Sequence, residues 1–197
     1  MPPPKYIDPR IFLDLEGLKD RADNITEDQL EAFLSCQWLK LDDVLRYIRI
    51  PSFRVVPGKK KDSSAKSQNQ NVRSKSDPNN CTLVFNILRR LKPPVSTILD
   101  VSVDDMSEKF HPHSNRDIIA CLKPEFSPNI EKWDWKKIDM CSDAIHEAAP
   151  NATEIYLYCS GNNAILKSWS ALDGLPQFAN VSLYIHCVNI TKASALA

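Results

Sequence analysis

The feature of this sequence that constrains the fold most is a strand pattern that passes directly into a helix pattern. Residues 155–159 form an apolar run rich in β-branched and aromatic residues, which is too short for a helix and lies between Pro150 and Gly161. The run therefore predicts a buried strand. The apolar residues between positions 164 and 169 then have the spacing of one face of a helix. We expect residues 160–163 to form a tight turn between the two elements.

The same alternation of strand and helix patterns continues on both sides of this unit. Further strand patterns occupy residues 97–103, 130–135 and 181–188. Helix patterns occupy residues 82–91, 114–122 and 139–148, with Ser114 and Asp139 as expected N-caps. Strands that are joined by helices run parallel when they share a sheet. We therefore predict an α/β fold with crossover helices and a mostly parallel small sheet of about four strands, in two or three layers. No Leu-x-x-Leu-x-Leu signature recurs, so a horseshoe of leucine-rich repeats is disfavoured.

The α/β domain is expected over residues 81–190, after a short helical N-terminal segment over residues 1–55. Thr26 and Gln29 match a capping box at the start of one helix in that segment. The apolar spacing of residues 41–48 predicts a second short helix. A short tail, residues 191–197, follows the domain. Since so little follows the last strand, we also expect the chain to be a fragment or a truncated protein.

Residues 56–80 differ in composition from the rest of the chain, because Lys, Ser, Asn and Gln dominate them. Such a segment buries too little apolar surface to offset the entropy of ordering it, so it predicts a flexible linker. Its basic run includes Lys59, Lys60 and Lys61. The run has two interpretations, a weak contact with a polyanion or a solvated basic linker.

The overall charge is balanced, with 25 Lys plus Arg against 25 Asp plus Glu. A neutral chain does not attract nucleic acid or an anionic membrane as a whole, so neither is an expected partner. No apolar run has the length of a membrane span, and the N-terminus lacks the apolar core of a signal peptide. We expect an intracellular protein, cytoplasmic or nuclear, whose six Cys are reduced. The four Cys in apolar segments are expected to act as small apolar residues; these are Cys121, Cys141, Cys159 and Cys187.

The sequence contains only four Gly, and this excludes several kinds of active site. No Gly-x-Gly-x-x-Gly, no phosphate loop and no Gly-x-Ser-x-Gly elbow occurs. No Cys-x-x-Cys and no His-Glu-x-x-His supplies a local frame for zinc. We expect no cofactor and no catalytic residue.

One polar cluster follows the strand pattern at 97–103 and consists of Asp104, Asp105, His111 and His113. Ligands of open α/β sheets bind beyond the carboxyl ends of the strands, so these side chains could hold a divalent metal or act as acid and base. The alternative is an acidic turn beside the next helix, with surface histidines.

Two further groups of residues each have a functional and a structural interpretation. The turn of Ser160, Gly161, Asn162 and Asn163 offers amide donors to an anion, or else it has Gly161 at positive φ and an Asn as N-cap. Aromatic residues of the strands and the last helix could line a peptide or ligand groove, or form the core; they are Trp133, Trp135, Trp169, Tyr156, Tyr158 and Tyr184.

Several strings in the sequence resemble the N-terminal region of filamentous-fungal proteins that carry a subtilisin-like serine peptidase domain. The strings are Asp14-Leu15-Glu16-Gly17-Leu18, Asp42-Asp43-Val44-Leu45-Arg46-Tyr47-Ile48, Ile50-Pro51, Val103-Asp104-Asp105, Pro112-His113-Ser114, Trp133-Asp134-Trp135-Lys136-Lys137, Cys141-Ser142, Ala148-Ala149-Pro150-Asn151, residues 157–166, Trp169-Ser170 and Asp173-Gly174-Leu175. They occur in the same order and cover most of the chain.

The resemblance implies an accessory module rather than a peptidase. The Asp-Ser/Thr-Gly, His-Gly-Thr and Gly-Thr-Ser segments of the subtilisin-like triad are absent from the sequence, so no catalytic residue carries over. We therefore expect a non-catalytic interaction or regulatory module with a protein partner, which by resemblance is a subtilisin-like peptidase domain. The alternatives are a metal-dependent enzyme that uses the Asp–His cluster and weak polyanion binding through the linker.

Overall fold

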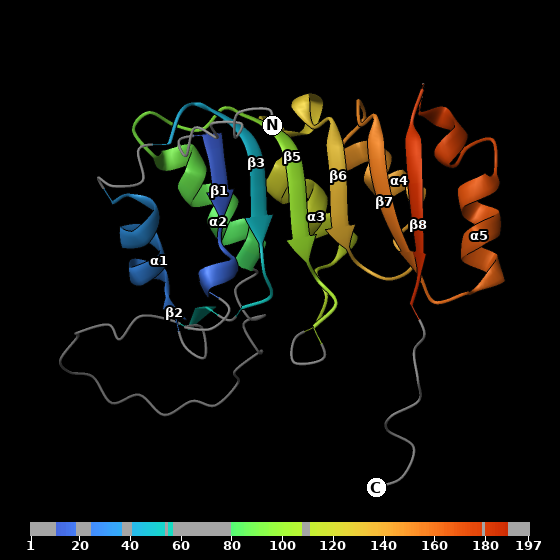
Figure 1. Ribbon diagram of the computed structural model, residues 1–197, viewed down its shortest axis with the longest axis horizontal. Helices are drawn as coiled ribbons and strands as arrows, with labels where there is room; N and C mark the ends of the chain where they lie inside the picture. Colours follow the sequence, from blue (N-terminus) through green and yellow to red (C-terminus); the bar gives the residue numbers. More distant parts are fainter. Residues whose placement is uncertain are drawn as a thin grey trace, which may run out of the picture.

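The chain forms one six-stranded sheet with helices packed against it (Figure 1). In this computed structural model, the described residues are 11–18, 25–36, 41–53, 55–56, 80–107, 111–178 and 180–188. The strands of the sheet are β1 (Phe12–Asp14), β3 (Val44–Ile50), β5 (Thr97–Asp104), β6 (Lys132–Lys136), β7 (Glu154–Cys159) and β8 (Ser182–Cys187). Two shorter strands, β2 (Ile25–Thr26) and β4 (Val55–Val56), pair separately. The α-helices are α1 (Glu27–Leu34), α2 (Asn80–Arg90), α3 (Asn115–Leu122), α4 (Ser142–Ala148) and α5 (Asn163–Ser170). The 3₁₀ helices are η2 (Glu16–Leu18), η3 (Ser127–Asn129) and η4 (Leu175–Gln177).

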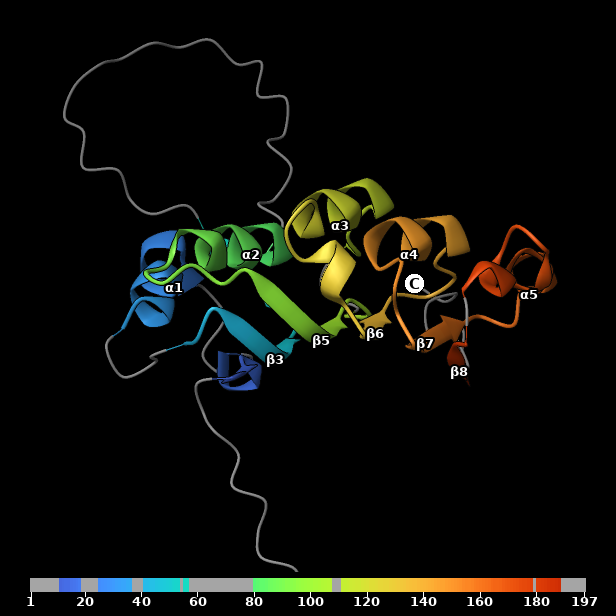
Figure 2. The same ribbon diagram turned by 90° about the horizontal axis from the view of Figure 1, so that it is seen from above.

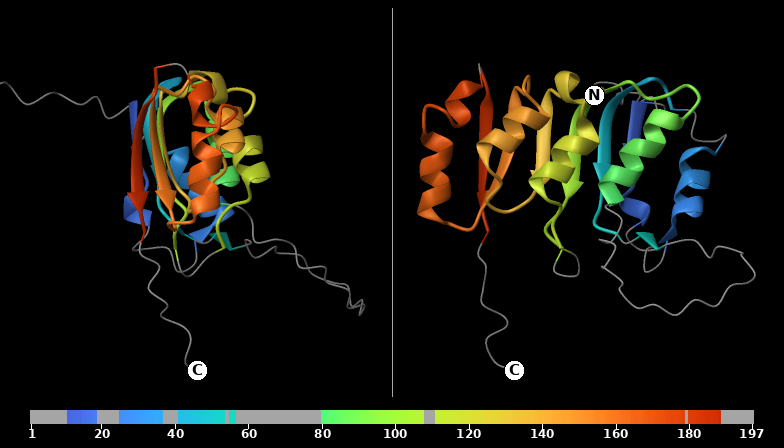
Figure 3. Two further views of the ribbon diagram at one scale, coloured as in Figure 1. Left: turned by 90° about the vertical axis from the view of Figure 1, so that its right-hand side faces the viewer. Right: turned by 180° about the vertical axis from the view of Figure 1, so that it is seen from behind.

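The order of the strands explains why the molecule has two layers. All neighbouring strands in the sheet are parallel, and they follow one another in the order β1-β3-β5-β6-β7-β8. Right-handed crossovers that always step in the same direction place their helices on the same face. Figures 2 and 3 show α1 to α5 on one face of the sheet. The two-layer arrangement is therefore the one adopted, and the described chain places no helix of the α type on the opposite face.

The α/β class with a mostly parallel sheet is confirmed, but the expected number of strands was too low. The additional strands are β1 and β3, which precede residue 56. The helix predicted over residues 41–48 is wrong, because this segment contains β3. Its apolar residues have helical spacing, but pairing with β5, from Val44 opposite Thr97 to Ile50 opposite Val103, makes the segment a strand. The N-terminal segment is thus only partly helical and supplies two strands to the shared sheet.

The core lies between the sheet and the helices. Alternate strand residues point toward the helices, and those of β6 and β7 are fully or almost fully buried; they include Trp133, Trp135, Ile155, Leu157 and Cys159. Helices α2, α3 and α4 pack side by side across this layer (Figure 2). The buried residues of both layers belong to one continuous cluster.

Two of the three expected N-caps are present at the starts of the helices. The capping box is confirmed, since Thr26 Oγ1 accepts from Gln29 N at 3.2 Å and Gln29 Oε1 accepts from Thr26 N at 2.9 Å. Ser114 caps α3 by accepting from Asp117 N at 3.1 Å. Asp139 does not cap α4, whose N-cap is Cys141. Instead the Asp139 backbone has φ of 56°, and its carboxylate binds Ser160.

Within the described chain, no helix combines the length and the apolar character that crossing a bilayer requires.

Candidate functional surface

The sheet face opposite the α-helices, called the open face below, is not covered by any of the five described α-helices. On β6, Trp133 and Trp135 are buried toward the helices, whereas Lys132 and Asp134 on the other side are partly exposed. The same alternation occurs on β7. The open face carries polar and aromatic side chains from every strand of the sheet; they are Asp14, Tyr47, Arg49, Asp100, Ser102, Asp104, Lys132, Asp134, Lys136, Glu154, Tyr156, Tyr158, Tyr184 and His186.

Four stacked rings, called the aromatic row below, lie on the open face of β7 and β8. The register places Tyr156 opposite Tyr184 and Tyr158 opposite His186. The rings of Tyr156 and Tyr184 stack with centroids 4.6 Å apart and an interplanar angle of 11°. The rings of Tyr158 and His186 stack at 5.2 Å and 17°. Parallel pairing in register brings these rings together because each pair occupies the same position on neighbouring strands.

Lys132 and Glu154 form an ion pair beside the aromatic row. Lys132 Nζ donates to Glu154 Oε1 at 2.6 Å and lies 4.7 Å from the centroid of the Tyr156 ring. Tyr156 OH donates to the same carboxylate oxygen at 2.6 Å. The hydrogen bond from Lys132 lowers the pKa of Glu154 below its usual value, and the bond to Glu154 raises the pKa of Lys132. Both groups are therefore charged at neutral pH.

Asp134 connects the aromatic row to the centre of the sheet. Its carboxylate accepts from Tyr158 OH at 2.7 Å and from Ser102 Oγ at 3.0 Å. Burial, followed by the hydrogen bond to Asp134, raises the pKa of Tyr158, so this hydroxyl keeps its proton.

At the far edge of the sheet, the Arg49 guanidinium lies 3.3 Å from the Glu16 carboxylate and 3.9 Å from the Asp14 carboxylate. Lys132, Asp134 and Arg49 are thus each paired with an opposite charge or with hydroxyls. Lys136, on the same side of β6, lies opposite Asp104 in the strand register.

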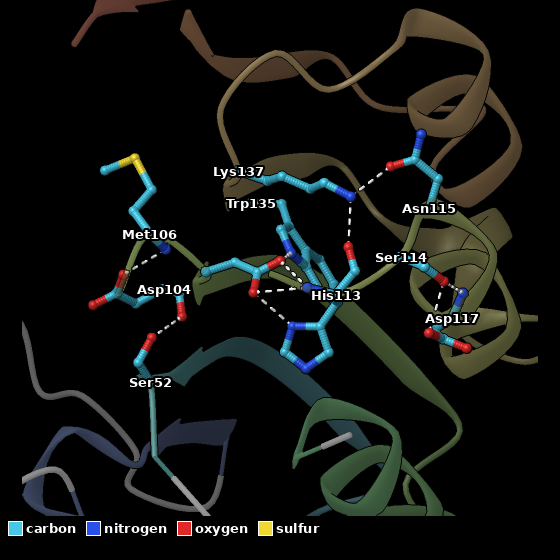
Figure 4. Close-up of polar contacts among 10 residues, drawn as sticks. Ser52, Asp104, Met106, His113, Ser114, Asn115, Asp117, Trp135 and Lys137 are labelled. Carbon is cyan, nitrogen blue, oxygen red and sulfur yellow. Dashed lines mark hydrogen bonds and ion pairs between the residues drawn. The ribbon is translucent and has the colours of Figure 1, made fainter. Parts of the chain in front are cut away.

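The cluster predicted at the end of β5 comes together only in part (Figure 4). Asp105 and His113 meet, with Oδ1 and Nδ1 2.7 Å apart. The Asp104 side chain instead accepts from Met106 N at 3.3 Å, and the Asp104 carbonyl accepts from Ser52 Oγ at 2.7 Å. His111 is exposed. Within the described part of the chain, no three His, Cys, Asp or Glu side chains are placed to hold a metal ion.

The contacts of Asp105 indicate a structural role for its carboxylate. Only 8% of Asp105 is exposed, and its oxygens accept from His113 N at 3.0 and 3.1 Å and from Trp135 Nε1 at 3.1 Å. Lys137 Nζ donates to the His113 carbonyl and, at 2.7 Å, to Asn115 Oδ1. Burial lowers the pKa of Lys137. These hydrogen bonds connect the carboxyl ends of β5 and β6 to the start of α3.

The turn at residues 160–163 has the predicted local geometry. Gly161 has φ of 83°, and Asn162 caps α5 by accepting from Ala164 N at 2.9 Å. Ser160 N and Ser160 Oγ donate to the two carboxylate oxygens of Asp139 at 2.9 and 2.6 Å. Because an acidic side chain already occupies these donors, the turn is poorly suited to a second anion, and Asn163 serves as the first residue of the helix.

The predicted aromatic set divides between the core and the surface. Trp133, Trp135 and Trp169 are buried, whereas the three tyrosines lie on the open face. The grouping of the tyrosines with Lys132, Asp134, Glu154 and His186 was not predicted from the sequence. Their shared signal is a polar or aromatic residue at every second position of consecutive strands. Lys59, Lys60 and Lys61 lie outside the described residues, so the polyanion contact stays a prediction.

Comparison of the chain with protein-family models, with curated proteins and with solved structures finds no match. The candidate surface is therefore described by its own geometry alone.

Proposed function

We propose that this chain is a non-catalytic α/β interaction module that binds a protein partner across the open face. The observation that carries the proposal is the uncovered sheet face with its aromatic row. Tyrosine is enriched in protein interfaces, because it supplies a large contact area and a hydrogen-bonding hydroxyl at little cost in side-chain entropy. Tyr184, which is 45% exposed on the edge strand, is the most exposed tyrosine of the aromatic row.

The charges of the open face favour a protein over a polyanion. Lys132 is paired with Glu154, and Arg49 lies beside Glu16. Phosphate-binding surfaces need unpaired cations, because much of their affinity comes from neutralising phosphates. A surface of alternating acidic, basic and aromatic groups instead suits the mixed polar rim and aromatic anchors of a protein interface.

For the partner, we propose a subtilisin-like serine peptidase domain. The sequence strings that resemble the N-terminal region of fungal proteins with such a domain support this choice. The chain would then act in cis or in trans as the accessory module of the peptidase and would contribute no catalytic group to it.

The test is a calorimetric titration of the purified chain with a purified subtilisin-like peptidase domain from a fungal protein of this kind. Binding is expected for the natural chain, and Tyr184→Ala should weaken it about tenfold or more. Arg116→Ala, at an exposed site on α3 and thus on the covered side of the sheet, should leave the affinity unchanged. Equal affinity of the Tyr184→Ala variant and the natural chain would contradict the proposed surface. Absence of binding by the natural chain would contradict the proposed partner.

A second candidate, an enzyme that uses the Asp105–His113 pair, is favoured by one contact. The carboxylate lies 2.7 Å from His113 Nδ1, which is the arrangement that orients an imidazole for acid–base chemistry or for a metal. This candidate predicts that a divalent metal raises the melting temperature and that His113→Ala abolishes the rise. If the melting temperature were the same with divalent metals as with a chelator, the enzyme candidate would be contradicted.

A further inference from the structure

Two cysteines face each other at the ends of β7 and β8, on the side of the sheet that carries the helices. The register places Cys159 directly opposite Cys187. Their sulfur atoms are 3.2 Å apart, and both cysteines are free thiols. Residues in register on neighbouring strands point to the same side, so this contact follows from the pairing of the two strands.

The backbone already has the separation that a disulfide requires. Neighbouring strands lie about 4.8 Å apart, and the Cα atoms of bridged cysteines are usually about 4.4–6.8 Å apart. Closing the bond therefore needs a small rotation of the side chains rather than a shift of a strand. The thiol of Cys121, by contrast, donates to the carbonyl of Ile118 at 3.1 Å, and Cys141 accepts from Asn115 at the same distance.

The two thiols differ in access. Cys187 is exposed on the edge strand, whereas Cys159 is fully buried. A soluble oxidant therefore meets Cys187 first, and Cys159 is the thiol in position to resolve the product. An exposed cysteine next to a resolving cysteine is typical of a reversible redox pair. The hydrogen bond with Cys159 raises the pKa of the Cys187 thiol, so the reaction proceeds through a small thiolate fraction and becomes faster as the pH rises.

We propose that Cys159 and Cys187 form a reversible disulfide that locks β8 onto β7, with a small-molecule disulfide such as oxidised glutathione as the oxidant. The Cys187 thiolate attacks the oxidant, whose disulfide breaks to release one glutathione thiol and leave a mixed disulfide on Cys187. Cys159 then loses its proton and attacks the Cys187 sulfur, which releases the second glutathione. Two protein thiols lose two electrons and two protons, and one glutathione disulfide becomes two thiols. This inference is independent of the proposed function.

The consequence of the bond lies in the anchoring of β8. Strand β8 lies at one edge of the sheet, pairs with β7 alone among the described strands and has only exposed residues, so it opens more easily than the strands between two neighbours. A bond from Cys187 to the buried Cys159 would hold the carboxyl end of β8 in place. It would also hold Tyr184 and His186 against their partners in the aromatic row.

The test treats the full chain with oxidised glutathione, blocks the remaining thiols by alkylation and maps the peptides by mass spectrometry. One intramolecular bond between Cys159 and Cys187 is expected, and dithiothreitol should reverse it. The melting temperature of the oxidised chain should rise by roughly 5 °C or more. A disulfide between other cysteines would overturn the proposal. So would alkylation of Cys159, because it would show that the Cys159 thiol stayed free after treatment with oxidised glutathione.

Two variants make the result independent of folding defects. Cys159→Ala removes the resolving thiol, so a glutathione adduct should persist on Cys187. Absence of this adduct in the Cys159→Ala variant would contradict the proposed order of attack. Cys36→Ser changes a cysteine far from the pair in the sequence and should leave the Cys159–Cys187 bond intact. Loss of the bond in Cys36→Ser would show that the pair does not form it alone.

Discussion

Two neighbouring tryptophans of β6 differ at the scale of single atoms. Trp133 and Trp135 are both buried, and their rings stack with centroids 5.4 Å apart. Trp135 Nε1 donates to Asp105 Oδ2, whereas Trp133 Nε1 is buried without a hydrogen-bond partner among the described residues. An unpaired buried donor costs free energy, so the two indoles contribute unequally to stability.

This difference predicts unequal costs for two identical substitutions. Trp135→Phe breaks the bond to Asp105, while Trp133→Phe removes a donor that has no partner. We expect Trp135→Phe to lower the free energy of unfolding by about 1–3 kcal/mol more than Trp133→Phe. Urea unfolding of both variants measures the difference, and each variant controls the other for lost ring volume. Equal losses would contradict the assigned hydrogen bonds.

The Lys132–Glu154 pair predicts a dependence of stability on pH. The pKa of Glu154 is lower in the folded chain because Lys132 donates to it. Its contribution to stability is therefore fully present above the unfolded pKa of about 4.3 and is lost as the pH falls through the lower folded pKa. The stability advantage of the natural chain over Glu154→Gln should be constant between pH 6 and 8 and should shrink below about pH 4. A pH-independent difference in urea midpoints would contradict the ion pair.

At the scale of elements, the turn from β7 into α5 depends on one backbone conformation. Gly161 has φ of 83°, in the left-handed region, and a Cβ atom there would meet nothing within 4 Å. The cost of a side chain at this position is thus backbone strain alone. Gly17 also has free space around it but does not have positive φ.

The two glycines form a matched pair of sites. We expect Gly161→Ala to lower the free energy of unfolding by about 1 kcal/mol, because an L-residue is strained in the left-handed region. Gly17→Ala should be neutral or slightly stabilising, since it only restricts the unfolded chain. Thermal or urea unfolding distinguishes the two variants. If Gly17→Ala cost as much as Gly161→Ala, the strain at the turn would not be the cause.

At the scale of the whole molecule, the sheet is stable at its centre and weak at β8. The central strand β5 pairs on both sides, with β3 and β6. Strand β8 pairs only with β7, and its Leu183 and Ile185 are 41% and 51% exposed. Few buried contacts and an unpaired edge favour local opening.

Native-state hydrogen exchange should therefore vary across the sheet. We expect the amides of β5 and β6 to exchange most slowly and those of the edge strand β8 to exchange faster than both. Oxidation of the Cys159–Cys187 pair should slow exchange at the carboxyl end of β8 and leave β5 unchanged. Protection of β8 equal to that of β5 in the reduced chain would contradict this distribution of stability.

Local signals in the sequence were sufficient where a few neighbouring residues decide the structure. The capping residues Thr26 and Ser114, the positive φ of Gly161 and the alternation of Lys132, Trp133 and Asp134 could all be predicted. Each depends on hydrogen bonds, sterics or a period of two within one segment. The alternation of strands and helices after residue 81 likewise predicted the parallel α/β class.

Contacts between distant segments decided the rest. The spacing of apolar residues in 41–48 predicted a helix, but the ladder with β5 makes this segment a strand. Asp139 binds Ser160 instead of capping its own helix. The order of six strands puts the helices on one face and leaves the other open, and this collects the tyrosines and charges into one surface. Short-range propensities determined the strands and helices after residue 81, whereas the pairing of strands far apart in the chain, which no local signal encodes, decided β3, the order of the sheet, its open face and its cysteine pair.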